Sequence, residues 1–391
     1  MGVSPRVLIV HNRYQQRGGE DAVVDDEARL LSKRGHSVEL YSRHNDEIGS
    51  VNRVALARQT MWSTRTTTDI DTLMGIFKPD VIHVHNTFPL ISPSVYWAAA
   101  RAGVPVVQTL HNFRLLCPQA MFLREDKVCE DCLGGVPWRG VARGCYRGSV
   151  AQTAVLASTL VLHRGIGTFA RKVARFIALS EFSRRKFVEG GLPEKAISVK
   201  ANFVERPLAD TRLPRQGFLF VGRLAPEKGV AILVAAMRQM PEARLDVIGE
   251  GPDAIKLAGL SNVRALGAKD AVAVQLAMLQ TVALVLPSLC YENFPRALVE
   301  AFAAGVPVIA SRLGAMAELV DEGRTGLLFE PNNADDLALK LRWVLAHPNE
   351  VRVMGENARR EFESKFTPEI NYEQLMAIYQ AAISQGGGGA R

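Results

Sequence analysis

The feature that most restricts how this chain can fold is a repeated alternation of short apolar runs with helical patterns. Six runs rich in β-branched residues occur in the first half, at Arg6–His11, Ser37–Tyr41, Asp80–His85, Val104–Leu110, Phe176–Ser180 and Ile197–Val199. Six more follow in the second half, at Phe218–Gly222, Arg244–Gly249, Val263–Gly267, Val282–Pro287, Val306–Ser311 and Gly326–Phe329. Runs that are apolar almost throughout are typical of strands covered on both faces. Strands and helices in alternation predict an α/β fold with a parallel, doubly wound sheet in each half.

A polar segment at residues 206–216, RPLADTRLPRQ, separates the two halves and contains two prolines without any periodicity. It predicts a linker, and a length of 391 residues also favours two domains. We therefore expect an N-terminal domain over residues 1–205 and a C-terminal domain over 217–366. A last helical pattern over 367–385 is expected to pack back on the N-terminal domain, before a flexible tail at 386–391. Two such domains leave a cleft, and open sheets bind ligands at the carboxyl ends of their strands.

Charge is distributed unevenly between the two halves. Residues 1–213 carry 29 Lys and Arg against 20 Asp and Glu, a balance of +9, whereas residues 214–391 carry 18 against 20, a balance of −2. A basic N-terminal half suggests either an anionic partner or a solvated basic surface. The N-terminus lacks a secretory pattern, and the longest weakly polar run, Val150–Leu162, is too short to span a bilayer. We therefore expect a cytoplasmic protein.

The first apolar run of the second half leads into the sequence GRLAPEKG, residues 222–229. Gly222 is expected to let the backbone turn after the strand, so that Arg223 and Lys228 both point into the cleft. Two cations at a strand-to-helix turn can offset the charge that develops on a diphosphate leaving group. A surface turn with solvated charges is the alternative interpretation.

A second motif, YENFPRALVEAFAAG, follows the run that ends near Pro287. Asn293, Phe294 and the proline after them are expected to open a helix, whose free backbone N–H groups favour an anion or sugar hydroxyls. Glu292 stands just before this helix, and Glu300 lies within its apolar face, where an unpaired carboxylate is unfavourable. At ~1.5 Å rise per residue the two carboxylates are about 12 Å apart. This separation suits contacts to a sugar and a ribose on either side of a diphosphate better than a paired acid and base.

Together the two motifs resemble those of the retaining nucleotide-sugar glycosyltransferases of family 4 (group 1), which have the GT-B fold. The resemblance is strong over about residues 218–329 and consistent in layout from Arg6 onward. It implies two Rossmann-like domains that face a cleft, with the donor bound by the C-terminal domain and the acceptor by the N-terminal domain. The family usually has glycine after the first glutamate and again two positions later, where this chain has Asn293 and Pro295.

The resemblance also implies roles for individual residues. Arg223 and Lys228 would hold the donor phosphates, Glu300 the ribose and Glu292 the transferred sugar. Phe294 and its neighbours would supply backbone N–H groups. The reaction would retain anomeric configuration, with the leaving phosphate helping to take the acceptor proton.

The same resemblance implies that no catalytic metal is needed. An Asp-x-Asp sequence is present at Asp69-Ile70-Asp71. We interpret these two acids as residues at a helix start near Thr68, where carboxylates are favourable.

Two features of the first half are candidates for contact with ligands. Gly18 and Gly19 would let the backbone approach a ligand closely, and the resemblance places such a pair near the diphosphate and the acceptor. A plain loop before a helix is the alternative. His111 follows the fourth run, and the resemblance places a histidine here beside the donor sugar, whereas a buried, satisfied histidine is the alternative. His83 and His85 alternate along the third run and are interpreted as packing or cleft-wall residues.

An insertion at about residues 113–148 contains four of the chain's five cysteines, Cys117, Cys129, Cys132 and Cys145. One Cys-x-x-Cys pair with two longer arms can close a tetrahedral zinc site, and four cysteine ligands leave no open position for water. Such a zinc would be structural and would stabilise a segment with little core of its own. Four reduced, unligated thiols and redox chemistry are the alternatives. Cys290 stands apart and is interpreted as a packing residue.

The basic half and the cysteines could also indicate nucleic-acid binding, but no recognition helix or aromatic platform is evident. The resemblance includes members with a cysteine-bearing insertion in surface-polysaccharide pathways, whose acceptors are membrane-bound lipid diphosphates. Basic residues could then contact anionic headgroups, namely Arg164, Arg171, Lys172, Arg175, Arg184, Arg185 and Lys186. Val150–Leu162 could lie at that interface or form a core helix.

We therefore predict an enzyme that transfers a sugar from a nucleoside-diphosphate sugar to a saccharide or lipid-linked saccharide in cell-surface polysaccharide biosynthesis. A structural zinc and a peripheral contact with the inner face of the plasma membrane are expected, and no nucleic-acid partner. The alternatives are a non-catalytic scaffold that binds sugar nucleotides and a zinc-dependent nucleic-acid-binding protein.

Overall fold

The computed structural model describes residues 4–206 and 214–386, and the chain divides into two units. Unit 1 comprises Met1–Ala120, Glu130–Ala201 and Asn371–Arg391. Unit 2 comprises Met121–Cys129 and Asn202–Ile370. Most of the expected linker at 206–216 and of the expected tail at 386–391 lies outside the described residues.

Among the described residues, each unit holds one six-stranded parallel sheet. The strands of unit 1 are β1 Val7–Arg13, β2 Val38–His44, β3 Val81–Asn86, β4 Val106–Thr109, β7 Arg175–Ala178 and β8 Ile197–Val199. Those of unit 2 are β9 Phe218–Val221, β10 Leu245–Ile248, β11 Val263–Ala265, β12 Ala283–Leu286, β13 Val308–Ser311 and β14 Gly326–Phe329. Every predicted apolar run coincides with one of these strands, which confirms the α/β class. A short antiparallel hairpin also forms, from β5 Leu123–Arg124 and β6 Lys127–Val128.

The order of the strands decides where each sheet can bind a ligand. The first sheet has the order β2-β1-β3-β4-β7-β8, and the second has the order β11-β10-β9-β12-β13-β14. The direction of winding therefore reverses between β1 and β3 in unit 1 and between β9 and β12 in unit 2. Such a reversal leaves a crevice outside the carboxyl ends of the two strands. The segments after these four strands carry most of the candidate residues.

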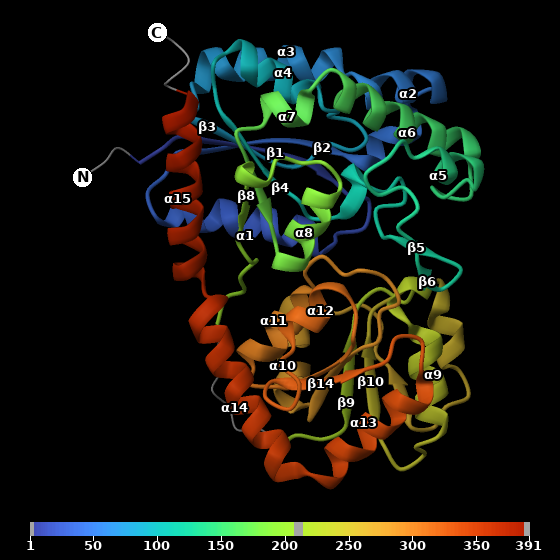
Figure 1. The fold of residues 1–391 in the computed structure, drawn as a ribbon. Coiled ribbons are helices and arrows are strands. Elements are labelled where there is room, and N and C mark those ends of the chain that lie inside the picture. Colours follow the sequence, from blue (N-terminus) through green and yellow to red (C-terminus); the bar gives the residue numbers. More distant parts are fainter. Residues whose placement is uncertain (1–3, 207–213, 387–391) are drawn as a thin grey trace. The chain divides into compact units, whose positions relative to one another are not determined.

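Helices cover both faces of the sheets. Figure 1 shows α3 and α4 on one face of the first sheet and α1 and α8 on the other. The helices of unit 1 are α1 Gly19–Lys33, α2 Arg53–Met61, α3 Thr64–Phe77, α4 Ser94–Arg101, α5 Trp138–Ala142, α6 Val150–Gly165, α7 Thr168–Lys172, α8 Glu181–Glu189 and most of α15 Pro368–Gly386. Those of unit 2 are α9 Val230–Arg238, α10 Ala271–Gln280, α11 Arg296–Ala303, α12 Gly314–Leu319, α13 Ala334–Ala346 and α14 Pro348–Lys365. Short 3-10 turns occur at Asn45–Ser50, Phe113–Leu115, Glu194–Ala196, Pro226–Lys228 and Pro252–Leu257.

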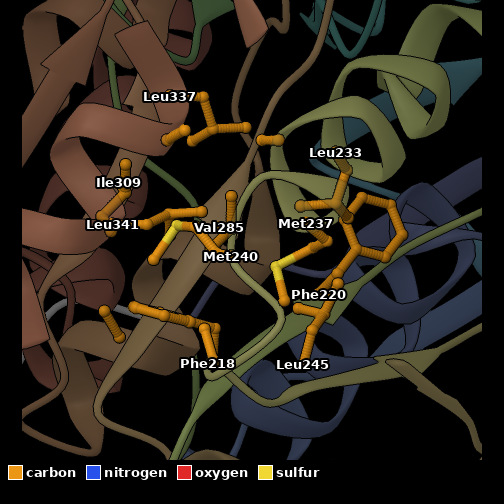
Figure 2. Close-up of a cluster of buried hydrophobic side chains, with 14 of the residues drawn as sticks. Phe218, Phe220, Leu233, Met237, Met240, Leu245, Val285, Ile309, Leu337 and Leu341 are labelled. Atoms are coloured by element: carbon orange, nitrogen blue, oxygen red, sulfur yellow. The ribbon is translucent and has the colours of Figure 1, made fainter. Parts of the chain in front are cut away.

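An extensive apolar cluster of unit 2 lies between its sheet and the pair α9 and α13 (Figure 2). Phe218 and Phe220 of β9 contribute to it from the sheet, Met237 from α9 and Leu341 from α13, all of them buried. Full burial of one such side chain stabilises the fold by roughly 1.5–3 kcal/mol. This packing anchors β9, and with it the start of the GRLAPEKG loop.

The last helix is tied to unit 1 by two hydrogen bonds. The Tyr372 hydroxyl lies 2.9 Å from Nε2 of His36, and the Tyr379 hydroxyl lies 2.7 Å from Nδ1 of His83. These contacts connect the end of the chain to the strands at its beginning.

The interpretation of Asp69 and Asp71 as helix-start acids is wrong. Helix α3 begins at Thr64, after the N-cap Ser63, so both acids lie in the middle of the helix. Asp69 accepts a hydrogen bond of 2.9 Å from the hydroxyl of Tyr41, and Asp71 pairs at 2.8 Å with an arginine of α4. The serine three residues before Thr66 supplied the stronger start signal, because its Oγ accepts the N–H of Thr66.

Candidate active site

Glycines bring the loop after β9 close to the neighbouring strands. Gly229 has a φ of +71°, and a Cβ there would lie 1.8 Å from the carbonyl oxygen of Pro287. Gly249 has a φ of +141°, and its Cβ would lie 1.9 Å from the carbonyl oxygen of Gly222. Gly222 itself has no positive φ, and a Cβ there would lie 3.5 Å from the ring of Phe220. The conformational freedom expected at Gly222 is therefore needed at Gly229 and Gly249 instead.

Lys228 and Glu292 form an ion pair at the carboxyl ends of β9 and β12. Nζ of Lys228 lies 2.6 Å from Oε1 of Glu292, and Oγ of Ser288 donates to the same oxygen at 2.7 Å. Burial alone would lower the pKa of Lys228, but the Glu292 carboxylate holds that pKa above its ordinary value. Burial alone would raise the pKa of Glu292, but the ammonium of Lys228 and the Ser288 hydroxyl hold it below its usual range. Both groups are therefore charged at neutral pH, and the structure brings the two predicted motifs together.

Arg223 lies on the same loop and pairs with Glu227. The guanidinium side chain is 58% exposed, so an anionic ligand can reach it, whereas the Glu227 side chain is only 10% exposed. The backbone N–H of Leu289 donates to the Glu227 carbonyl at 2.9 Å, which links this loop to the segment after β12. Sequence reasoning missed Glu227, although its spacing of four residues from Arg223 is a known signal for an ion pair.

Helix α11 begins at Arg296, after the N-cap Pro295, and carries the second glutamate of the motif. Nε of Arg296 donates to Oε1 of Glu300 at 2.8 Å, and both side chains are about three-quarters buried, with 25% and 29% exposed. The carboxylate therefore does not lie unpaired among apolar side chains. It is accessible and has a partner that a ligand can replace.

Asn293 and Phe294 are buried at the start of this motif. The Phe294 ring packs edge-on against the ring of Phe366, with 5.9 Å between the ring centroids. Its side chain therefore belongs to the packing of unit 2, which leaves only its backbone for the predicted contact with a ligand.

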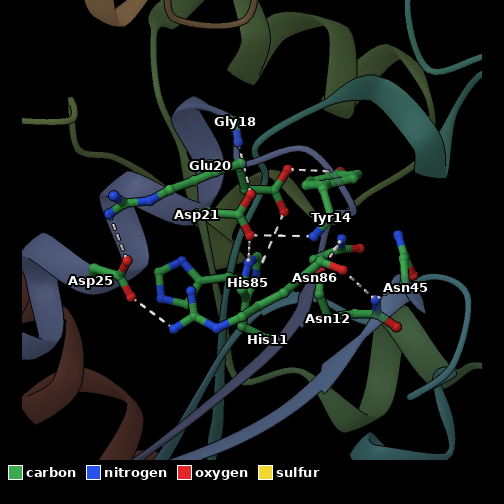
Figure 3. A network of polar contacts seen from close by, with 12 residues as sticks. His11, Asn12, Tyr14, Gly18, Glu20, Asp21, Asp25, Asn45, His85 and Asn86 are labelled. Atoms are coloured by element: carbon green, nitrogen blue, oxygen red, sulfur yellow. Dashed lines mark hydrogen bonds and ion pairs between the residues drawn. The ribbon is translucent and has the colours of Figure 1, made fainter. Parts of the chain in front are cut away.

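A second polar cluster lies around the carboxyl ends of β1 and β3 in unit 1 (Figure 3). Nε2 of His11 lies 2.8 Å from Oδ1 of Asp21, and Oδ2 of Asp21 accepts the backbone N–H of Gly18 at 2.9 Å. Burial alone would raise the pKa of Asp21, but His11 and the Gly18 N–H hold it below its ordinary value. Gly18 is the N-cap of α1, and a Cβ on Gly19 would meet no atom within 4 Å. The glycine pair therefore forms a helix start with open space beside Gly19.

Glu20 lies beside this cluster in the first turn of α1, and the sequence indicates it, like Asp21, only as a favourable acid at a helix start. Only 11% of its side chain is exposed, and Oε2 accepts a hydrogen bond of 3.1 Å from the hydroxyl of Tyr14. Burial raises the pKa of Glu20 to about 8. The carboxyl group is therefore mostly protonated at neutral pH, and a single sequence offers no signal for such a shift.

His111 lies just after β4 and contacts two histidines of β3 through a buried network. Its Nε2 lies 2.8 Å from Nδ1 of His85, whose ring is tilted against that of His83 with 4.1 Å between the ring centroids. Burial lowers the pKa of His83 to about 4 and lowers the pKa values of His85 and His111 well below the usual range. Glu27 and Lys200 complete the network as a fully buried ion pair at 2.6 Å. Neither was singled out from the sequence.

Glu27, His83 and His85 form a group of potential metal ligands whose atoms lie within 4.8 Å of one another. The ammonium of Lys200 already compensates the Glu27 carboxylate and repels a further cation. Both ring nitrogens of His83 lie 2.7 Å from buried hydroxyls, one of them that of Tyr379. We therefore interpret these residues as a hydrogen-bonded network and not as a metal centre.

Comparison with known families identifies the chain. The family described as "Glycosyl transferases group 1" matches residues 210–361, and "Glycosyl transferase 4-like domain" matches residues 18–202. The chain belongs to the group 1 glycosyltransferases. The predicted membership of the group 1 glycosyltransferases is thereby confirmed, and the two matches cover both units of the chain.

Curated relatives of the chain have the names of different transferases. It is 34% identical to the sulfoquinovosyl transferase of Arabidopsis thaliana over 322 residues, which are 78% of this chain and 58% of the relative. It is 30% identical to the phosphatidyl-myo-inositol mannosyltransferase of Mycolicibacterium smegmatis over 247 residues, 58% of this chain and 63% of the relative. Each match covers less than two thirds of the relative's own length.

Solved structures share the fold over nearly the whole chain. HepE of Anabaena in complex with UDP-glucose is 18% identical, with a TM-score of 0.68 and coverage of 96% of this chain and 100% of that one. Sucrose-phosphate synthase of Thermosynechococcus elongatus is also 18% identical, with a TM-score of 0.72 and coverage of 97% and 100%. The predicted GT-B fold is confirmed.

Three cysteine-bearing segments of unit 1 meet at Gly140. A Cβ on Gly140 would lie 3.3 Å from Sγ of Cys132 and 3.3 Å from Cγ of Pro118, which follows Cys117. The backbone N–H of Cys145 donates to the Gly140 carbonyl at 3.0 Å. Segments that are far apart in the sequence are thus gathered around one glycine.

The tip of the same insertion groups with unit 2 and not with the remainder of the insertion. Leu123 of β5 packs with Leu289 and Cys290 in a small apolar cluster. The rings of Phe122 and Tyr291 also meet edge-on, with 6.0 Å between their centroids. Cys290 is buried in this cluster, and burial raises the pKa of its thiol, so its interpretation as a packing residue is confirmed. The insertion therefore contacts the segment that leads into the glutamate motif.

Proposed function

We propose that this glycosyltransferase moves a sugar from a nucleoside-diphosphate sugar to a saccharide or lipid-linked saccharide, with retention of anomeric configuration. The observation that carries the proposal is the placement of Arg223 and the Lys228–Glu292 pair where the second sheet reverses its winding. One held ammonium and one exposed guanidinium can offset the negative charge of a leaving diphosphate. The UDP-glucose complex of HepE supports a sugar nucleotide as the donor class.

The residues of unit 2 suit the proposed bond changes. The bond between the anomeric carbon and the phosphate oxygen breaks, and its electron pair stays on the phosphate, where Arg223 and Lys228 stabilise the charge. The acceptor oxygen attacks the same face of the sugar, and its proton passes to the departing phosphate oxygen. Glu292 accepts hydrogen bonds from the transferred sugar, and Glu300 exchanges its bond with Arg296 for bonds to the ribose hydroxyls. No separate general base is needed in this scheme.

The acceptor and the cellular role rest on the first unit and the insertion. We place a surface-polysaccharide precursor near Gly18 and Gly19, because these residues follow the carboxyl end of β1. Open space beside Gly19 and the polar cluster around Asp21 suit a hydroxyl-rich ligand. The similar proteins include a phosphatidyl-myo-inositol mannosyltransferase and a glycogen synthase, so their names indicate a lipid acceptor in one case and a saccharide acceptor in the other.

A donor panel tests the function. Release of UDP or GDP is measured for the wild type and for Arg223→Ala and Glu300→Ala, with Arg264→Ala as the matched control. Arg264 is also an exposed arginine of unit 2, but it pairs with Asp246 on β10. We expect kcat/KM to fall by roughly 100-fold or more in the first two variants and to stay unchanged in the control.

Two outcomes would contradict transfer. Donor binding without nucleotide release in any donor and acceptor combination would support the non-catalytic scaffold. Absence of donor binding, with a steep salt-dependent affinity for DNA, would support the nucleic-acid alternative.

We further propose that Cys117, Cys129, Cys132 and Cys145 hold a structural zinc. The donor set fits, because four thiolates are a common ligand set for structural zinc and leave no position for a catalytic water. The meeting of three cysteine-bearing segments at Gly140 supports it. Elemental analysis should find about one zinc per chain, and a metal-free protein whose thiols all react freely would contradict the site.

A peripheral membrane contact is a separate proposal. No helix among the described residues is both long and apolar enough to cross a bilayer. Helix α6 buries Leu156 and Leu160 but exposes Val161 and Leu162 by 41% and 42%, so it is a core helix with an apolar outer edge. Several of the predicted basic residues already have partners, as Arg184 does with two glutamates.

The membrane proposal therefore rests on the exposed edge of α6 with Arg171 and Lys172 of α7. Flotation with anionic vesicles tests it for the wild type and for Val161→Ser/Leu162→Ser. We expect the wild type to float and the double variant to remain in solution. Equal flotation of both proteins, or flotation with neutral vesicles alone, would contradict the proposal.

A further inference from the structure

The buried network under His111 has a directional order that the proposed chemistry does not use. His85 is its central member. Its Nδ1 lies 2.8 Å from Nε2 of His111, and its Nε2 faces Oε2 of Glu27 at 3.5 Å, where neither of these two buried atoms forms a hydrogen bond with another described residue. Burial and the surrounding positive groups hold the pKa values of both histidines well below the usual range, so both rings are neutral at neutral pH. Each ring then carries one proton, which can be bound to either Nδ1 or Nε2.

Glu27 determines which nitrogen of His85 carries the proton. Its Oε1 lies 2.6 Å from Nζ of Lys200, and both side chains are fully buried. The ion pair makes the carboxylate an acceptor with no proton to donate. A bare Nε2 on His85 would place two lone pairs against each other in a buried site, which is unfavourable. The proton of His85 is therefore expected on Nε2, facing Glu27.

The position of the proton on His85 determines the position of the proton on His111. With its proton on Nε2, His85 can only accept a hydrogen bond at Nδ1, so His111 must donate from its own Nε2. Nδ1 of His111 is then left as an acceptor. This ring is half-buried just after β4, and within the described residues its Nδ1 meets no protein donor.

We propose that the Glu27–Lys200 pair is a positioning device that acts through His85 to keep His111 an acceptor at Nδ1. The proposal rests on the proposed function for one point, the identity of the group that meets this nitrogen. There an acceptor-only nitrogen binds a sugar hydroxyl and disfavours a carboxylate or carbonyl at the same position. The device thus favours a neutral, hydroxylated donor sugar over one that carries an acid group there.

The tautomer can be read directly by NMR on the full chain with isotope-labelled histidine. The wild type should show His111 protonated at Nε2 and bare at Nδ1, with the signals assigned by comparison with His111→Asn. In Glu27→Gln/Lys200→Met, the amide of the new side chain can donate to Nε2 of His85, which reverses every bond and moves the His111 proton to Nδ1. Changing both members together avoids a buried, unpaired charge.

Tyr379→Phe is the matched control, because its hydroxyl contacts His83 in the same network but not His85 or His111. It should leave the His111 tautomer unchanged. The proposal is overturned by a wild-type His111 that carries its proton on Nδ1, by a tautomer that is the same in the double variant, or by an equal change in the control. The wild-type spectrum alone is decisive if the double variant fails to fold.

Donor kinetics give the second measurement. We expect KM for a neutral hexose donor to rise roughly ten- to hundredfold in the double variant, as for a lost hydrogen bond in a buried site, while the affinity for free nucleotide is unchanged. An equal loss of affinity for the sugar donor and for the free nucleotide would indicate a general structural effect. It would overturn the role of His111 in donor specificity. A reversed tautomer in a protein that turns over no donor would leave the device intact and contradict the proposed function.

Discussion

At the scale of single residues, the clearest result is that Lys228 and Glu292 are each other's partner. They are 64 positions apart, and each was predicted to contact a different part of the donor. The ion pair keeps both charged despite their burial, and Ser288 supports the carboxylate from the other side. A donor that enters this site therefore meets charges that are already in place, which is the condition for electrostatic stabilisation of a transition state.

This pairing predicts the effect of Glu292→Gln. The amide keeps the shape but removes the negative charge that orients Lys228 and that, in the proposed mechanism, accepts hydrogen bonds from the sugar hydroxyls. We expect kcat to fall about 100-fold or more, with only a small change in nucleotide affinity. Steady-state kinetics and calorimetry with the free nucleotide measure the two quantities. Ser288→Ala is the control and should have a much smaller effect, so equal losses in the two variants would contradict the role given to Glu292.

Glu20 gives a pH dependence whose sign follows from its shift. The carboxyl titrates near 4.5 when unfolded and near 8 when folded, so between these values the folded state binds more protons. Its contribution to stability is greatest below about pH 4.5 and is lost as pH rises toward 8. Glu20→Gln cannot titrate and should gain stability over the wild type across this window, with the gain levelling off above it.

Urea unfolding at several pH values measures that difference. Glu39→Gln on β2 is the control, because it makes the same substitution at an exposed glutamate. A difference between Glu20→Gln and the wild type that does not change with pH would show that the buried carboxyl does not titrate as stated.

At the scale of elements, prediction was most successful for the strands. A strand covered on both faces is apolar at nearly every position, and a single sequence shows this as a continuous run. Helix starts were harder, because Asp69 and Asp71 were interpreted as a start although α3 had already begun at Thr64. The short polar side chain that caps the helix, Ser63, is a weak signal among several nearby hydroxyl residues.

The packing of α13 predicts a stability difference between two leucines on one helix. Leu341 is fully buried in the large apolar cluster of unit 2, whereas Leu339 is 59% exposed. Leu341→Ala should lower the free energy of unfolding by roughly 2–5 kcal/mol, because it removes apolar contacts and leaves a cavity. Leu339→Ala should change it by less than about 0.5 kcal/mol. Urea unfolding of both variants measures this, and similar values would contradict the assigned face of the helix.

At the scale of the whole molecule, two segments group far from their sequence neighbours. Residues from Asn371 onward belong to unit 1, and the insertion tip Met121–Cys129 belongs to unit 2. The proposed zinc would stabilise the insertion, whose tip packs with Leu289 and Cys290 within unit 2.

Metal removal tests whether the insertion is needed for acceptor binding but not for nucleotide binding. We expect a strong chelator to weaken acceptor binding and lower the melting temperature, while nucleotide affinity changes little, because the donor residues are held by the separate core of unit 2. Added zinc should restore both properties, and Cys132→Ser should reproduce the chelated state. Loss of nucleotide binding on chelation, or a chelator-insensitive melting temperature, would contradict this assignment.

Sequence by itself determined the class of fold, the two parallel sheets and the glycosyltransferase motifs, because these depend on local periodicity and on residues close together in the chain. It also identified Arg223, Lys228, Glu292 and Glu300 as candidates. It did not reveal Glu27 or Lys200, because a charged residue within a polar helix or after a short strand gives no sign of complete burial.

Only the tertiary structure decided which of these groups meet. Strand order placed β1 beside β3 and β9 beside β12, and neither arrangement follows from the order of strands along the chain. Close approach of the loops requires glycine at Gly229 and Gly249, where a side chain would collide with a backbone that is distant in sequence. Protonation is decided in the same way, because the pKa of Glu20 and the proton position on His111 depend on burial and on partners that only the folded chain provides.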